Sequence, residues 1–349
     1  MNLGFYNFYR QYNQNRMFQH ASAEIGDDLI YPNVYMAKRL REMGHSVATI
    51  DTAPLASFDA VVFLDYPIKL LNSYFRRLIK NGDKPIYLMI CESPAMRPDN
   101  WIISNHAPFR KVFTWSPALV DGRKYFRMRM PFKLPDFAAY QPSQADKFCC
   151  LIASQKYSWV SQELYTERVR AIRWFEKNHP GEFDLYGQRW DRFFFQKKLS
   201  IVNPVLNLVY RKCPWLPRRQ RFPSARGSVA AKRDILRQYK FSICYENASY
   251  PGWITEKILD PMFAGCVPIY QGDPGVAGFV PKEAFIDKRQ FADYESLYRY
   301  LKEMPPTQYE AMRQAIHRFV HGEAIQAMGP EAFTELIVRE IINDRPAAP

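Results

Sequence analysis

The stretch YENASYPGWITEK, Tyr245–Lys257, lies between the apolar run FSIC, which is typical of a strand, and ILDPMFAG, which has helical periodicity. Pro251 and Gly252 favour a bend, and Thr255 is a residue type that commonly caps the first turn of a helix. Polar and aromatic side chains therefore gather where a strand ends and a helix begins. In an α/β fold, this is where ligands bind.

Two charged residues begin the predicted helix. Lys257 lies in its first turn, where a cation is unfavourable because the free N–H groups and the helix dipole favour an anion. We interpret its position as a sign of an anionic ligand, most simply a phosphate. Glu256 suits the dipole and could accept two hydrogen bonds from ribose hydroxyls. The alternative is an ordinary capped helix whose lysine reaches solvent.

The length and the order of the apolar runs predict two α/β lobes facing each other across a cleft. A chain of 349 residues is long for one core, since single cores stop growing at about 250–300 residues. Short apolar runs alternate with runs of helical period, which is typical of helices layered on mostly parallel sheets. We expect an N-terminal domain at residues 1–140, a C-terminal domain at 141–349, and helices after Phe285 that pack back across both lobes. The expected strands are Leu3–Tyr6, Val47–Asp51, Ala60–Leu64, Ile86–Cys91, Val112–Trp115, Phe148–Ala153, Phe183–Tyr186, Phe241–Tyr245 and Val267–Tyr270, and the expected helices include Val34–Met43, Gln162–Lys177, Val229–Arg237 and Thr255–Ala264.

The cysteines and the apolar runs favour a cytoplasmic location. No pair of cysteines has the C-x-x-C spacing of a zinc or redox motif, and several lie inside apolar runs, which suits buried thiols in a reducing compartment. The N-terminal residues lack the apolar core of a signal peptide, and no run approaches the roughly 18 apolar residues that span a bilayer. The cysteines are Cys91, Cys149, Cys150, Cys213, Cys244 and Cys266.

The positive charge is concentrated in one segment. Residues 189–240 contain fourteen Lys or Arg and two Asp, a net charge of +12 out of a formal +13 for the chain. Within them, the insert 189–226 interleaves basic residues with apolar and aromatic ones. This mixture fits peripheral contact with an anionic membrane, and the alternative is a solvated basic loop. Nucleic acid is not expected as a partner, because the charge is confined to one insert.

The best-known nucleotide motifs are absent. The chain has no G-x-x-x-x-G-K-[ST] and no G-x-G-x-x-G, and no two aspartates are separated by one residue. The stretch YKFSICYENASYPGWITEKILDPMFAGCVPIYQGDP, Tyr239–Pro274, nevertheless resembles the signature of the α1,3/α1,4-fucosyltransferases. CESP at Cys91–Pro94, FRMRMPF at Phe126–Phe132, the region around Ser154 and Arg168, and FIDKRQF at Phe285–Phe291 extend the resemblance in family order. These are inverting enzymes that use GDP-fucose and have the GT-B fold, two Rossmann-like α/β/α lobes; this chain resembles the bacterial type without a transmembrane anchor.

The resemblance implies a donor site in the second lobe. Glu256 would hold the ribose hydroxyls, Lys257 and Arg168 would hold the diphosphate, and Glu246 and Asn247 would lie beside the transferred sugar. Taken without the resemblance, Glu246 and Asn247 could simply be the polar end of a buried strand, and Arg168 a solvent-facing arginine on an amphipathic helix.

The resemblance also implies the chemistry. Glu92, after the apolar run PIYLMIC, would be the base that deprotonates the acceptor hydroxyl; its alternative is a surface glutamate that caps a turn. Trp253 stands in the donor site where the family usually has tyrosine, which leaves its sugar contacts open. No metal or other cofactor is required, although a divalent cation could stimulate the reaction.

The sequence does not identify the acceptor molecule. An oligosaccharide is expected, with transfer to O3 of N-acetylglucosamine or glucose in a surface glycan, as in lipopolysaccharide biosynthesis or protein glycosylation. Such an enzyme would be cytoplasmic and peripheral to the inner membrane. The alternatives are the same fold using another nucleotide-linked deoxysugar, and a noncatalytic protein that binds a membrane or an anionic polymer.

Overall fold

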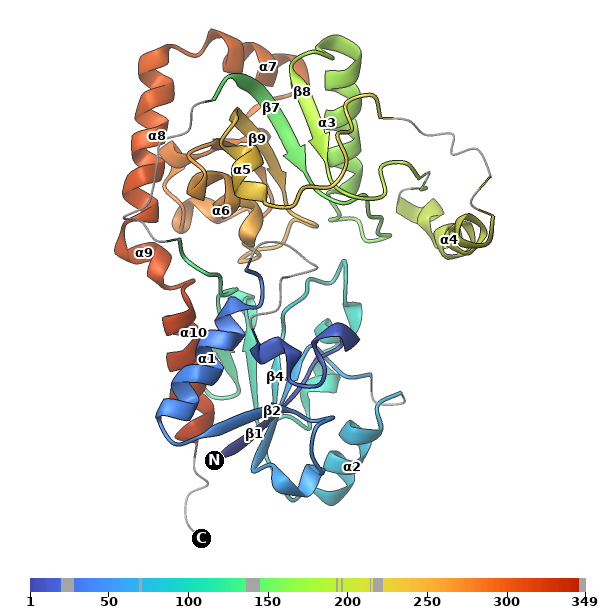
Figure 1. Ribbon diagram of the computed structural model, residues 1–349, viewed down its shortest axis with the longest axis vertical. Helices are drawn as coiled ribbons and strands as arrows, with labels where there is room; N and C mark the ends of the chain where they lie inside the picture. The colour runs from blue at the N-terminus through green and yellow to red at the C-terminus, as the bar shows by residue number, and fades with distance from the viewer. Residues whose placement is uncertain are drawn as a thin grey trace. The chain divides into compact units, whose positions relative to one another are not determined.

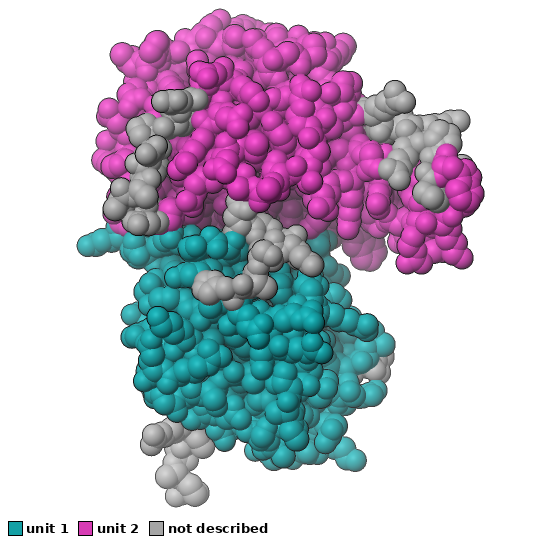
Figure 2. Space-filling view, viewed as in Figure 1, with its two compact units in different colours: residues 1–134, 323–349 teal, residues 135–322 magenta. Residues whose placement is uncertain are grey.

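The computed structural model describes residues 1–19, 28–68, 71–135, 145–192, 194, 195, 197–213, 215 and 222–344. The chain forms two compact units (Figure 2). Unit 1 comprises residues 1–134 and 323–349, and unit 2 comprises residues 135–322. The sequence placed the boundary at residue 140, which lies outside the described residues.

Unit 1 is built on a six-stranded parallel sheet with the order β2-β1-β3-β4-β5-β6 (Figure 1). The chain moves from β1 to β2 on one side and then to β3 on the other, so the strand order reverses beside β1. The strands are β1 (Asn2–Tyr6), β2 (Ser46–Thr49), β3 (Ala60–Leu64), β4 (Ile86–Met89), β5 (Lys111–Thr114) and β6 (Tyr125–Arg127). The helices are α1 (Tyr31–Glu42), α2 (Ser73–Asn81), α9 (Glu323–Gln326), α10 (Pro330–Ile337) and the π-helix η12 (Val338–Ile342).

Both faces of this sheet are covered, which explains why its strands are apolar without interruption. In β3, Val62 points into one core cluster while Val61 and Phe63 point into the other. Helices α1 and α10 lie side by side and supply apolar residues to the first cluster (Figure 1). Helix α2 supplies Phe75 and Leu78 to the second.

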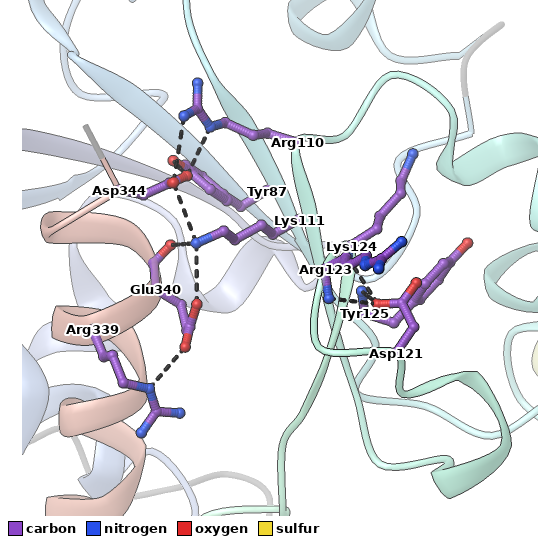
Figure 3. Close-up of polar contacts among 10 residues, drawn as sticks. All are labelled: Tyr87, Arg110, Lys111, Asp121, Arg123, Lys124, Tyr125, Arg339, Glu340 and Asp344. Carbon is purple, nitrogen blue, oxygen red and sulfur yellow. Dashed lines mark hydrogen bonds and ion pairs between the residues drawn. The ribbon is translucent and has the colours of Figure 1, made fainter. Parts of the chain in front are cut away.

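A network of charges ties the C-terminal end of the described chain to this sheet (Figure 3). The Lys111 ammonium on β5 donates to the Glu340 carboxylate at 3.0 Å and lies 3.2 Å from the Asp344 carboxylate. Arg110 and Tyr87 also donate to Asp344, at 2.7 and 2.9 Å. Residues 323–349 therefore belong to unit 1; the sequence placed them in a domain at 141–349 whose helices after Phe285 pack back across both lobes.

Unit 2 is built on a five-stranded parallel sheet with the order β11-β10-β9-β7-β8. From β7 the chain goes to β8 on one side and later to β9 on the other, so the strand order reverses between β7 and β9. The strands are β7 (Lys147–Ile152), β8 (Phe183–Tyr186), β9 (Tyr239–Tyr245), β10 (Val267–Gln271) and β11 (Ile286–Asp287). The helices are α3 (Tyr165–Asn178), α4 (Asn203–Lys212), α5 (Lys232–Leu236), α6 (Glu256–Phe263), α7 (Tyr294–Glu303) and α8 (Pro306–Val320).

The alternation of strands and helices agrees with the sequence in both units. Each of the nine expected strands overlaps an observed strand, with ends that differ by up to two residues. The short edge strands β6 and β11 were not expected, and neither was α4. That helix lies inside the basic insert, where the sequence suggested a loop or a membrane-contacting segment.

Candidate functional site

The topology of unit 2 sets the place of the site. In open parallel sheets, ligands bind beyond the carboxyl ends of the strands, at the point where the strand order reverses. In unit 2 that point lies between β7 and β9. Glu246 and Asn247 directly follow β9, and α6 begins at Glu256, after the predicted loop.

Glu246 is the centre of this site. Its side chain has no exposed surface, and its two carboxylate oxygens accept hydrogen bonds from the backbone N–H and the hydroxyl of Thr255, at 2.8 and 2.7 Å. The ammonium of Lys257 lies 3.4 Å away. Burial raises the pKa of Glu246, and the positive charge of Lys257 opposes that shift. The carboxylate therefore joins the end of β9 to the first turn of α6.

The first turn of α6 differs from the sequence expectation in one detail. Thr255 is the N-cap residue, but its side chain makes no capping hydrogen bond. Its hydroxyl instead donates to Glu246 and accepts from Lys257, the second of these at 2.9 Å. The cap is thus replaced by a contact with the buried carboxylate.

Lys257 has protein counter-charges. Its ammonium donates to Glu256 at 3.1 Å, and its side chain is only 20% exposed. The pKa of Glu256 is raised by burial, but the positive charges of Lys257 and Lys232 outweigh this and lower it to about 2. Lys257 therefore does not simply reach solvent, and the repulsion from the helix dipole that suggested a phosphate is already offset by Glu246 and Glu256.

Arg168 on α3 is buried, with 3% of its surface exposed. Its Nη2 donates to the carbonyl of Tyr245 at 2.6 Å and to the side chain of Asn247 at 3.0 Å. Burial lowers its pKa, although nearby negative charges oppose the shift. Within the described part of the chain, Nη1 of Arg168 has no hydrogen-bond partner, so this nitrogen is available to a ligand. The solvent-facing alternative for Arg168 is wrong.

A second ion pair, which the sequence did not indicate, joins α5 to α6. Lys232 at the start of α5 donates to Asp260 on α6 at 2.8 Å. Burial raises the pKa of Asp260, and Lys232 opposes that shift. No motif marks Lys232, because its partner lies on another helix and only the packing of α5 on α6 brings the two together.

The loop after β10 packs closely against Glu246, and Trp253 adjoins it through Tyr270. Trp253 is 2% exposed, and its carbonyl accepts from the hydroxyl of Tyr270 at 3.5 Å. Gly272 leaves no room for a side chain, since a Cβ there would lie 2.4 Å from Cγ of Glu246 and 2.4 Å from the Tyr270 hydroxyl. The glycine thus permits the close approach of two loops.

Glu92 lies in unit 1, in the loop after β4, and is partly exposed. Its carboxylate accepts from the hydroxyl of Tyr9 at 3.2 Å. Asp65, which follows β3 with φ of 63° and is 3% exposed, accepts from the backbone N–H groups of Cys91 and Glu92 at 2.8 and 3.1 Å. A buried carboxylate therefore holds the loop that presents Glu92, and the sequence reasoning missed Asp65 because a lone aspartate after a strand carries no motif.

The predicted site residues thus fall into two groups. Unit 2 brings together Arg168, Glu246, Asn247, Glu256 and Lys257, with Trp253 adjoining them through Tyr270. Unit 1 holds Glu92. Among the described residues, no group of three or more His, Cys, Asp or Glu is arranged to hold a metal ion.

The site in unit 2 can bind an anion that carries hydroxyl groups. The first turn of α6 offers its N–H groups, Arg168 offers a guanidinium nitrogen, and Lys257 adds an ammonium beside the carboxylate of Glu256. Cationic groups and a helix N-terminus suit phosphates, and a carboxylate suits the hydroxyls of a sugar. A sugar nucleotide carries both kinds of group.

A family model covers part of unit 2. Residues 218–314 match the model described as Glycosyltransferase family 10 (fucosyltransferase) C-term. Among curated proteins, the alpha-(1,3)-fucosyltransferase FucT of Helicobacter pylori is 37% identical over 75 residues, which are 22% of this chain and 16% of that protein. The GDP-fucose protein O-fucosyltransferase 3 of Gallus gallus is 36% identical over 99 residues, 28% of this chain and 21% of that protein. The alignments thus span less than a quarter of these relatives.

Solved structures resemble the whole chain. A crystal structure of an alpha1,3-fucosyltransferase aligns over 99% of this chain and 91% of its own, with a TM-score of 0.55 and 16% identity. Anabaena HepE in complex with UDP-glucose aligns over 98% and 99%, with a TM-score of 0.55 and 12% identity. The expected GT-B fold, two parallel α/β lobes, is confirmed.

Proposed function

We propose, from the match of residues 218–314 to the model described as Glycosyltransferase family 10 (fucosyltransferase) C-term, that the chain transfers fucose from GDP-fucose to a hydroxyl group with inversion at the anomeric carbon. One observation carries the proposal. The cluster of Arg168, Glu246, Asn247, Glu256 and Lys257 lies at the carboxyl end of β9, where the strand order reverses.

The diphosphate, the ribose and the transferred sugar of the donor would each have a partner in or beside this cluster. The diphosphate would lie against Arg168 and Lys257, and the ribose hydroxyls against Glu256. Glu246 is fully buried and engaged by Thr255 and Lys257, so we assign it to positioning those residues rather than to direct contact with the nucleotide. Asn247, held by Arg168 through its amide oxygen, would adjoin the transferred sugar with Trp253.

The reaction follows from these charges. The acceptor oxygen attacks the anomeric carbon, the bond from that carbon to the diphosphate breaks, and GDP departs with the electron pair. Glu92 takes the proton of the attacking hydroxyl. Because negative charge grows on the diphosphate as the bond breaks, Arg168 and Lys257 stabilise the transition state more than the bound donor. No step in this scheme requires a metal ion.

The acceptor is best sought among two classes. A relative is an alpha-(1,3)-fucosyltransferase, which favours O3 of N-acetylglucosamine or glucose in a surface oligosaccharide. Others are GDP-fucose protein O-fucosyltransferases, which makes a serine or threonine hydroxyl the second class. The donor has a second candidate as well, because a neighbour of the same fold was solved with UDP-glucose.

Transfer assays with three labelled donors test the proposal. GDP-fucose, a GDP-linked sugar other than fucose, and UDP-glucose are each incubated with galactose and N-acetylglucosamine disaccharides and with serine-containing peptides, and the product's linkage and anomeric configuration are determined by NMR. We expect transfer from GDP-fucose alone, with inversion. Transfer from UDP-glucose but not from GDP-fucose would overturn the donor assignment, and retention would overturn the mechanism.

Lys257→Gln tests the role of the cluster. We expect turnover to fall by about 10²- to 10³-fold, as for comparable electrostatic groups, with the fold monitored by circular dichroism. The exposed Lys282 of the same unit provides the matched control, and Lys282→Gln should leave turnover unchanged. Normal turnover in folded Lys257→Gln would remove this residue from the mechanism.

A further inference from the structure

One part of the basic insert, residues 199–215, presents apolar side chains to the outside. The described residues expose eighteen large apolar side chains, and seven of them lie between residues 199 and 215. Six of these lie along η8 (Lys197–Val202) and α4, and we call them the insert face: Leu199, Ile201, Val202, Val205, Leu208 and Val209. Figure 1 shows α4 at the outer edge of unit 2, away from the parallel sheet.

Helix α4 exposes most of its aliphatic side chains to water. Asn203 has no exposed surface and exchanges hydrogen bonds with the backbone of Phe195, at 2.7 and 2.9 Å. Asn207, one turn later, donates to the hydroxyl of Tyr157 at 3.3 Å. The two amides therefore hold one side of the helix, which also carries the half-buried Leu206 and Tyr210, against the protein, while Val205 and Leu208 on the other side are 66% and 43% exposed.

The short helix η8 repeats this pattern. Ser200 is 4% exposed, whereas its neighbours Leu199 and Ile201 are 63% and 75% exposed. A surface helix in water normally turns its apolar stripe to the core and its polar face outward. Two consecutive elements with exposed apolar side chains form a candidate surface for a partner.

The charges around the insert face identify that partner. Lys198, Arg211 and Lys212 are exposed at its two ends, and residues 197–213 contain no acidic residue. A second copy of the chain would bring these like charges together, which disfavours self-association. An anionic bilayer surface instead attracts Lys and Arg while accepting apolar side chains at the level of the headgroups.

We propose that the insert face docks on an anionic lipid bilayer, with η8 and α4 lying in the plane of the interface. Leu199, Ile201, Val205 and Leu208 would enter the boundary between headgroups and acyl chains. Lys198, Arg211 and Lys212 would contact lipid phosphates. Trp215, which is 76% exposed, suits the same level, because indole rings favour this interface. This surface is separate from the donor site, so the proposal does not depend on fucosyl transfer.

Flotation of the full chain with vesicles tests the charge requirement. We expect binding to vesicles of phosphatidylcholine with phosphatidylglycerol, and much weaker binding to phosphatidylcholine alone or in high salt. The variant Lys198→Gln/Arg211→Gln/Lys212→Gln should bind roughly 100-fold more weakly. The matched control, Arg41→Gln/Arg77→Gln/Lys80→Gln, removes three exposed cations of unit 1 and should bind as the unsubstituted chain does. Equal loss in both variants would overturn the proposal.

A second variant tests the apolar side chains. Ile201→Ser/Val205→Ser/Leu208→Ser should lower vesicle binding by at least 10-fold, whereas Leu71→Ser/Ile103→Ser, at exposed apolar positions of unit 1, should not. Analytical ultracentrifugation of the unsubstituted chain tests whether a second copy of the chain, instead of a bilayer, covers the insert face. If the chain does not bind anionic vesicles but forms a dimer that the Ile201→Ser/Val205→Ser/Leu208→Ser variant abolishes, the insert face is an interface between copies and the proposal fails.

Hydrogen–deuterium exchange of the unsubstituted protein needs no variant. On anionic vesicles we expect slower exchange within residues 198–213, with little change elsewhere in the chain. Protection that appears in another part of the chain and not in these residues would place the membrane contact elsewhere and overturn the proposal.

Discussion

At the scale of single residues, the candidate site is a balanced set of charges. The cations Arg168, Lys232 and Lys257 lie among the anions Glu246, Glu256 and Asp260. Buried ions are costly unless they are paired, so this balance allows an anion-binding cluster to remain folded before any ligand is present. A diphosphate would then compete with Glu246 and Glu256 for Lys257, instead of filling a site that lacks counter-charge.

Stability at low pH should report on this balance. The pKa of Glu256 is lowered to about 2 in the folded chain, from an ordinary value of 4.5. Its stabilising contribution is therefore present above pH 4.5 and is lost as the pH falls toward 2. We predict that the difference in free energy of unfolding between the unsubstituted chain and Glu256→Gln shrinks by about 1 kcal/mol between pH 7 and pH 3.5.

Urea unfolding at the two pH values measures this difference. Glu310→Gln provides the control, because the Glu310 side chain is 54% exposed and its ion pair with Arg313 contributes little. A difference that does not change with pH for Glu256→Gln would show that Lys257 and Lys232 do not hold the carboxylate ionised.

The residue types of the site could be predicted from sequence, but their partners could not. The polar end of β9 and the N-cap position of Thr255 follow from local patterns. Thr255 donates to Glu246 instead of capping α6. This contact depends on the path of the loop between β9 and α6. Likewise Asp65 and Lys232 take part only because separate elements pack together, and no local pattern records this packing.

At the scale of elements, the close approach of the loops after β9 and β10 depends on Gly272. We predict that Gly272→Ala lowers the free energy of unfolding by about 1–3 kcal/mol, because its Cβ would overlap Glu246 and Tyr270, both of which are fully buried. We also expect weaker GDP binding, since a displaced Glu246 no longer positions Lys257. Urea unfolding and calorimetric titration with GDP measure the two effects.

Gly278→Ala is the matched control for that substitution. A Cβ at Gly278 meets no atom within 4 Å, so both stability and GDP affinity should stay close to those of the unsubstituted chain. Should Gly272→Ala bind GDP as tightly as Gly278→Ala does, the positioning role of Glu246 would have no support.

The position of the π-helix η12 on unit 1 depends on the ion pairs that Lys111 forms with Glu340 and Asp344. Lys111 is 15% exposed and faces Glu340 and Asp344, which are 11% and 12% exposed (Figure 3). Lys111→Met removes the cation that these two nearly buried carboxylates share, although Arg110 still pairs with Asp344 and Arg339 with Glu340, and we predict a loss of about 2 kcal/mol of stability. Arg339→Gln, at a side chain that is 67% exposed, should cost less than about 1 kcal/mol. Hydrogen–deuterium exchange of residues 338–344 and urea unfolding distinguish these outcomes; equal effects would contradict the prediction.

At the scale of the whole molecule, the sequence predicted two α/β lobes but not which lobe holds the end of the chain. The apolar residues of α10 and η12 have helical spacing, which predicts a helix but does not indicate which surface it packs against. Their apolar side chains join the cluster of α1 and β1, and Glu340 and Asp344 meet Lys111. Such complementarity becomes visible only when both surfaces are folded.

The division into units separates donor binding from proton transfer. The proposed donor residues all belong to unit 2, whereas Glu92 belongs to unit 1. We therefore predict that Glu92→Gln lowers the rate of transfer by about 10²- to 10⁴-fold, the usual contribution of a general base. The dissociation constant of GDP should stay within about twofold, because the amide has the shape of the carboxylate and the proposed nucleotide contacts all lie in unit 2.

Single-turnover transfer and calorimetric titration with GDP measure the two quantities on one preparation. Lys257→Gln is the complementary variant, and it should weaken GDP binding as well as transfer, because its charge acts on the diphosphate in both states. If Glu92→Gln weakens GDP binding as much as Lys257→Gln does, Glu92 is part of the donor site and another group takes the proton. If Glu92→Gln transfers fucose at the normal rate, Glu92 is not the base, and the loop that Asp65 holds has a structural role.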